Sequence, residues 1–234
     1  MAYELLRPEW GVTRPIRGVL FDMDGLVLDS ESLYSRFWRE ACAHFGFSMN
    51  YEESLCMRAV NRQVGAETLH RFFGAQADYL AIRDRRIQLM DAYIEEYGVA
   101  LKPGIRELLH YLQDQGIRTA ITSSSPLERI RRYLARHDLD TAFDALCSGR
   151  DMPRGKPEPD IYLHGAKMLG LPPEHCLALE DAPAGILSAY RAGCLSVMIP
   201  DLDQPDAETK KLLYAQADSL LDIIDLTEHH NAHR

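Results

Sequence analysis

The stretch GVLFDMDGLVLDSE, residues 18–31, joins a short apolar run to a pair of aspartates. The apolar residues before Asp22 predict a buried strand. Asp24 and Gly25, flanked by apolar residues, are a strong turn signal, which puts Asp22 at the strand end and Asp24 in the turn. Because the chain holds 35 acids in 234 residues, a pair of this spacing also arises by chance. The stretch alone therefore favours a structural and a functional role equally.

Further along, short apolar runs alternate with segments of helical periodicity, which predicts an α/β fold. We expect a Rossmann-like parallel sheet with helices on both faces. One helix start is well marked, with Ser125 as N-cap, Pro126 at the first helical position and Glu128 completing a capping box. The expected strands after the first lie near residues 119–121, 143–147, 177–179 and 195–199, and the expected helices near 105–115, 126–134, 159–169 and 183–192.

The interval between the first two expected strands is about 95 residues long, whereas a βαβ unit needs only ~30. It contains apolar stripes at helical spacing that end at Gly46 and Gly98. A structureless loop of this length is rare in a compact domain. We therefore predict an inserted all-helical cap domain over residues 32–98, on a core domain formed by residues 1–31 and 99–234.

Polar side chains follow several of the expected strands at the point where each ends. Asp22 follows the first, Ser123 the second, and Glu180 and Asp181 follow the run at 177–179, while Lys156 lies in the loop after the weaker strand. Taken singly, each has an ordinary explanation as a helix cap or a solvated side chain. Together they lie at the carboxyl ends of parallel strands, where α/β sheets bind ligands.

These side chains suit one kind of chemistry. Carboxylates of Asp22, Glu180 and Asp181 with a backbone carbonyl make a hard oxygen site for Mg²⁺. Lys156 adds a positive charge and Ser123 a hydroxyl donor for a phosphate dianion. The Asp22 carboxylate can then attack phosphorus, and Asp24 can protonate the leaving oxygen.

Composition limits the classes of partner and compartment. The formal charge of −9 opposes binding to nucleic acid or to an anionic membrane surface. Five cysteines without C-x-x-C spacing indicate a reducing compartment. The N-terminal residues show no signal-peptide pattern, and no apolar run approaches the about 18 residues of a membrane span, so we expect a cytoplasmic protein. The histidines near the C-terminus, His229, His230 and His233, are expected to form a solvated tail.

FDMDG, the strand-end Ser123, GKPEPD and LEDAPAG together resemble the four motifs of the haloacid dehalogenase superfamily, in the same order, over residues 18 to about 200. The insertion resembles that superfamily's C1 cap, and the chain is similar to the β-phosphoglucomutase-like phosphatases. The resemblance implies that Asp22 forms an aspartyl-phosphate and that Asp24 is the general acid and base. It further implies phosphate binding by Ser123, Ser124 and Lys156, and Mg²⁺ binding by Asp22, the Asp24 carbonyl, Asp181 and Glu180.

Two departures from the pattern bear on the prediction of activity. Ala182 stands where many relatives carry serine, and residues 59–62 align only roughly with a G-x-S-R stretch common near the mutases. Arg58, Asn61 and Arg62 are the candidate specificity residues of the cap.

The prediction is a Mg²⁺-dependent phosphatase that hydrolyses a small phosphorylated metabolite, a sugar phosphate or a nucleotide-like monoester. The alternatives are a sugar phosphomutase and a non-catalytic metabolite-binding protein on the same scaffold. The intact pair of Asp22 and Asp24 speaks against the binding protein, which needs no acid. We expect a monomer or a weak dimer with no nucleic-acid or membrane partner.

Overall fold

The structure is a computed structural model that describes residues 3–10, 15–58 and 62–232. The chain forms two compact units, unit 1 from Met1–Leu28 and Leu101–Arg234, and unit 2 from Asp29–Ala100. In unit 1, Leu28 and Leu101 pair as an antiparallel bridge. In unit 2, the Asp29 amide donates to the Ala100 carbonyl at 2.9 Å. The two segments that connect the units, residues 28–29 and 100–101, are therefore paired with each other at their unit 1 ends and again at their unit 2 ends.

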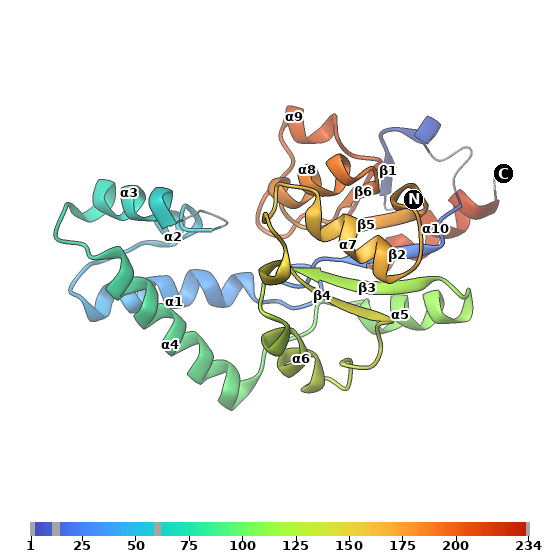
Figure 1. Cartoon of the computed structure of the whole chain (residues 1–234). Helices are drawn as coiled ribbons and strands as arrows, with labels where there is room; N and C mark the ends of the chain where they lie inside the picture. The colour runs from blue at the N-terminus through green and yellow to red at the C-terminus, as the bar shows by residue number, and fades with distance from the viewer. Residues whose placement is uncertain (1–2, 11–14, 59–61, 233–234) are drawn as a thin grey trace. The chain divides into compact units, whose positions relative to one another are not determined.

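Unit 1 is built on a seven-stranded sheet of order β1-β7-β6-β5-β2-β3-β4 (Figure 1). Neighbouring strands are parallel except for β1, which is antiparallel to β7. This confirms the predicted Rossmann-like sheet. Every residue of β2 and β5 is buried, as expected for strands covered on both faces. The strands are β1 (Tyr3–Leu5), β2 (Gly18–Phe21), β3 (Arg118–Ser123), β4 (Ala145–Ser148), β5 (Cys176–Glu180), β6 (Leu195–Met198) and β7 (Ala215–Ala217).

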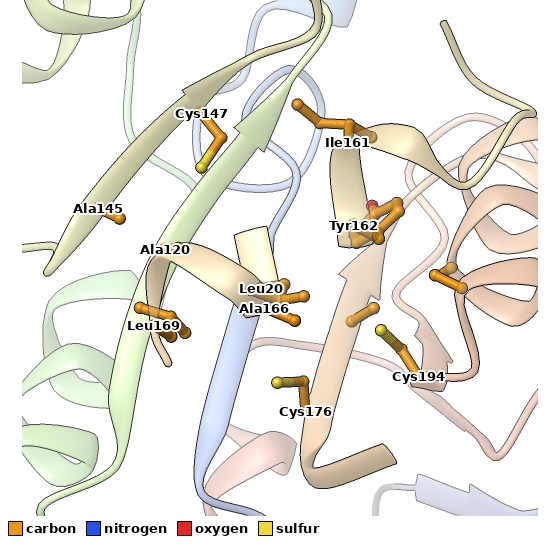
Figure 2. Packing of buried hydrophobic residues seen from close by; sticks show 13 residues of the cluster. Leu20, Ala120, Ala145, Cys147, Ile161, Tyr162, Ala166, Leu169, Cys176 and Cys194 are labelled. Carbon is orange, nitrogen blue, oxygen red and sulfur yellow. The ribbon is translucent and has the colours of Figure 1, made fainter. Parts of the chain in front are cut away.

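Helices α7 and α8 cover one face of the sheet, and α5, α6 and α10 lie on the other (Figure 1). Leu20 of β2 is in register with Ala120 of β3, and both belong to the buried cluster that includes Ala166 of α7 (Figure 2). The small alanine side chains let the helix approach the strands closely. The helices of unit 1 are α5 (Ile105–Asp114), α6 (Leu127–Ala135), α7 (Asp160–Met168), α8 (Pro183–Ala192), α9 (Ala207–Lys210) and α10 (Asp222–Ala232), with short 3-10 turns η1 (Pro8–Trp10), η2 (Gly149–Asp151) and η3 (Pro173–His175).

The start of α6 differs from the prediction. Its N-cap is Pro126 in an extended conformation, and no side chain caps it, so the predicted capping box of Ser125 and Glu128 is wrong. The helix begins one residue later than expected, which moves Ser125 out of the N-cap position. The Ser125 hydroxyl instead donates to Asp24 Oδ2 at 3.2 Å.

The prediction of a solvated histidine tail is also wrong for His230. Helix α10 buries Leu226 and His230, which recur at helical spacing, and His230 is only 6% exposed. The His230 Nδ1 atom lies 2.7 Å from the hydroxyl oxygen of the buried Tyr214. His233 lies outside the described residues.

The described part of unit 2 consists of helices and their connections. Helix α1 packs on α4 and on α2, and a buried cluster that includes Trp38, Leu69 and Ile82 forms its core. Helix α4 ends at Gly98, as the apolar stripe predicts. In the ranges that the structure describes, no helix is both long and apolar enough to cross a bilayer. The helices are α1 (Glu31–His44), α2 (Tyr51–Leu55), α3 (Arg62–Phe73) and α4 (Tyr79–Tyr97).

Candidate active site

The carboxyl ends of β2, β3 and β5 bring the predicted site residues of unit 1 to one edge of the sheet. β2 lies between β3 and β5 and is parallel to both. Ser123 ends β3 and Glu180 ends β5, while Asp22 follows β2, and its amide still donates to the Leu179 carbonyl at 3.0 Å. The chain then turns at Gly25, whose φ of 86° is a left-handed conformation that favours glycine. This sharp turn places Asp24 directly after the strand end.

Three buried carboxylates converge at this edge. Asp22, Glu180 and Asp181 each offer an oxygen, and these oxygens lie within 4.8 Å of one another. Like charges at such a range repel one another strongly in a buried site unless a cation or proton is present. An all-oxygen donor set is the kind that Mg²⁺ prefers. The acidic cluster therefore fits the predicted divalent cation.

Lys156 lies among these carboxylates. Its Nζ donates to Asp22 Oδ1 and to Glu180 Oε1, each at 2.5 Å, and to the Thr122 carbonyl at 3.1 Å. Burial by itself would lower the pKa of Lys156, but the charges of Asp22 and Glu180 outweigh it and hold the pKa well above its usual value. Lys156 is therefore a permanent positive charge at this site.

The loop that carries Lys156 is anchored to α8. The Ser188 hydroxyl donates to the Glu158 carbonyl at 2.6 Å, and Arg191 donates to the Pro157 carbonyl at 3.1 Å. These contacts hold the two residues directly after Lys156. A lysine far along the chain from Asp22 is thereby kept at the same edge of the sheet.

Two residues without an assigned role in the sequence prediction hold Glu180. The hydroxyl of the fully buried Tyr162 donates to Glu180 Oε1, and the Lys156 Nζ lies 5.1 Å from the centre of the Tyr162 ring. Gly185, in the first turn of α8, lies directly against the carboxylate, since a Cβ placed there would be 1.9 Å from Glu180 Cδ. Burial raises the pKa of Glu180, and Lys156 opposes that shift. The only sequence signal for these partners is their place in the GKPEPDIY and EDAPAG stretches.

The serines after β3 occupy different environments. Ser123 is buried, and its Oγ accepts the Ser125 amide at 3.1 Å, whereas Ser124 is exposed. Asp24 is partly exposed and accepts the Ser125 hydroxyl. The predicted nucleophile, acid, metal ligands and phosphate-binding groups of the core are therefore all found at the same strand ends.

The cap candidates belong to unit 2. Arg58 Nε donates to Glu31 at 2.5 Å in an ion pair whose side chains are 6% and 15% exposed. Arg62 is the exposed first residue of α3. Asn61 lies outside the described residues.

Comparison with known proteins identifies the family of this chain. A family model of haloacid dehalogenase-like hydrolases matches residues 16–193. The chain is 35% identical to hexitol phosphatase A of Escherichia coli (strain K12) over 181 residues, which cover 76% of this chain and 80% of that relative. It is 27% identical to β-phosphoglucomutase of Bacillus subtilis (strain 168) over 190 residues, which cover 78% and 82% of the two chains. A HAD family hydrolase from Deinococcus radiodurans, crystallised with phosphate and sodium, matches with a TM-score of 0.77 at 25% identity, over 92% of this chain and 96% of that one.

Proposed function

Since the chain belongs to the haloacid dehalogenase-like hydrolase family and is a phosphatase of that family, we propose that it hydrolyses the phosphate monoester of a small sugar or sugar alcohol. Hexitol phosphatases A and B of Escherichia coli, 35% and 31% identical to this chain, act on substrates of that class by their names. The single observation that carries the proposal is the convergence of Asp22, Lys156, Glu180 and Asp181 at one edge of the sheet.

Asp22 is the proposed nucleophile. Lys156 binds its Oδ1 and so limits rotation of the carboxylate. An Asp22 oxygen forms a bond to phosphorus while the ester P–O bond breaks, and the leaving alkoxide takes the proton of Asp24. Water then attacks the phosphorus of the aspartyl-phosphate, its proton passes to Asp24, and phosphate leaves as the Asp22 carboxylate is restored.

The remaining residues bind charge. Ser123, Ser124 and Lys156 are the proposed partners of the phosphoryl oxygens, two by hydrogen bonding and one by its ammonium. Asp22, the Asp24 carbonyl, Asp181 and Glu180 would hold Mg²⁺, which when bound supplies positive charge to the acidic cluster and to the phosphoryl group.

Substrate selection is proposed to reside in unit 2, where residues 32–98 form the predicted cap. Arg62 is exposed, whereas the guanidinium of Arg58 is already paired with Glu31. Of the two arginines, Arg62 is therefore the better candidate for contact with an anionic substrate.

The test is a panel of sugar and sugar-alcohol phosphates scored for released phosphate, with Mg²⁺ and with a chelator. Asp22→Asn should lower kcat by at least about 1,000-fold, because the nucleophile is lost. Asp114→Asn, a matched change on the exposed side of α5, should keep the wild-type rate. A wild-type rate in Asp22→Asn would refute the nucleophile, and an isomerised sugar phosphate without free phosphate would identify a mutase.

A further inference from the structure

We propose that Ser125 is a positioning residue that fixes the Asp24 carboxyl group for proton transfer to the leaving oxygen. The inference rests on the proposed function, in which Asp24 is the general acid. The Ser125 hydroxyl donates to Asp24 Oδ2 at 3.2 Å, although the two residues are 101 positions apart in the chain. This serine precedes a helix that no side chain caps, so its hydroxyl is committed to Asp24 rather than to the helix.

Ser125 is itself held on both sides by other serines. Its amide donates to Ser123 Oγ at 3.1 Å, and its carbonyl accepts the hydroxyl of Ser148 at 2.9 Å. Ser148 ends β4 and is 3% exposed, while Ser125 is 8% exposed. The Ser125 hydroxyl that donates to Asp24 is therefore held in place by residues at the ends of β3 and β4. A serine in a flexible loop would lack these contacts.

A fixed donor matters because a general acid must lie within hydrogen-bond reach of the atom it protonates. Asp24 is partly exposed and sits in a turn, so the orientation of its carboxyl group is not set by burial. With Oδ2 accepting the Ser125 hydroxyl at 3.2 Å, the rotation of the Asp24 carboxyl group is restricted. Ser125 thereby limits the orientations in which Asp24 meets the leaving oxygen.

The same loop joins two parts of the proposed mechanism. Ser123 is a proposed phosphate-binding residue, and its Oγ accepts the amide of the residue that orients Asp24. Residues 123–125 therefore connect a proposed phosphate-binding residue to the residue that orients the proposed acid.

The test uses the dependence of rate on the leaving group. An aliphatic phosphate ester needs its leaving oxygen protonated, whereas p-nitrophenolate leaves without an acid. In Ser125→Ala, kcat/KM for the fastest aliphatic ester of the panel should fall about 10- to 100-fold, as a fraction of the about 10²- to 10⁴-fold that a general acid contributes. The value of kcat/KM for p-nitrophenyl phosphate should change less than about threefold, because this parameter reports the step that releases the leaving group.

Three further variants make the outcome decisive. Ser125→Thr keeps the hydroxyl and should restore most of the aliphatic rate, while Ser125→Cys keeps the size with a weak donor and should behave as Ser125→Ala. Ser196→Ala removes another buried serine hydroxyl, one that donates to the Leu212 carbonyl away from the site, and should leave hydrolysis of both esters unaffected.

The variant Asp24→Asn distinguishes a failure of the positioning role of Ser125 from a failure of the proposed function. If Asp24→Asn loses the aliphatic ester selectively and Ser125→Ala does not, the positioning role is wrong and the proposed function stands. An equal loss on both esters in Ser125→Ala would also overturn the positioning role, since it would mean general damage to the site. If Asp24→Asn hydrolyses the aliphatic ester normally, the assignment of Asp24 as acid fails.

Discussion

Replacing Gly185 with alanine should displace Glu180 without removing any charged or hydrogen-bonding group. The new Cβ would lie 1.9 Å from Glu180 Cδ and 2.0 and 2.2 Å from its two carboxylate oxygens, whereas ordinary contact begins at 3.4 Å. The carboxylate must therefore move by about 1.5 Å, the difference between 3.4 and 1.9 Å. Its bond to Lys156, now 2.5 Å, could not keep both its length and its direction if Lys156 stayed in place.

The expected consequence is a large loss of activity in a folded protein. Misplacing a reacting or charge-binding group by about 1 Å costs about 100-fold in rate, so kcat/KM in Gly185→Ala should fall by at least that factor. The backbone of Gly185 is helical, and alanine is favoured over glycine in a helix by ~0.5–1 kcal/mol. This gain opposes the ~1–3 kcal/mol that overpacking usually costs.

A double-mutant cycle measured by thermal or urea unfolding isolates the clash. In the wild-type background Gly185→Ala should lower the free energy of unfolding, whereas in Glu180→Ala it should raise it by ~0.5–1 kcal/mol, because the helix gain remains and the carboxylate is absent. Equal effects in the two backgrounds, or a fully active Gly185→Ala enzyme, would refute the reasoning.

Two further predictions concern Lys156 and the five cysteines. Replacing Lys156 with methionine at saturating Mg²⁺ should weaken inhibition by inorganic phosphate about 30- to 1,000-fold, equivalent to ~2–4 kcal/mol, and unchanged inhibition would contradict its role as a phosphate ligand. Burial raises the pKa of three thiols to about 11 or 12, those of Cys42, Cys147 and Cys176. These thiols stay protonated at pH 8, and Cys194 is also buried, so a thiol reagent should label only Cys56 rapidly in the native protein and all five cysteines after unfolding; rapid labelling of a second native thiol would contradict the packing.

The sheet and the polar groups at its edge were predictable from local patterns. Apolar runs that end in Asp22, Ser123 and Glu180 mark strand ends, and parallel strands necessarily collect those ends at one edge. Charge repulsion among the acids then indicated a cation, and the position of Lys156 indicated a second positive group. These features follow from the hydrophobic period, the residue types and their order along the chain.

The partners of these groups were not predictable in the same way. A serine before a proline and a helix is an ordinary cap in sequence, yet the Ser125 hydroxyl bonds Asp24 instead of the helix. A histidine close to the C-terminus is expected to be solvated, yet α10 buries His230 against Tyr214.

The chemistry available at the strand ends follows from residue types and their order, which set the charges and donors that a parallel sheet can assemble. The contacts of Tyr162 and Gly185 with Glu180, and of Ser125 with Asp24, arise only when the folded chain packs distant segments together. A hydroxyl has several partners within its local stretch of chain. Which one it takes depends on distances of about 3 Å between segments distant in sequence, and packing alone sets those distances.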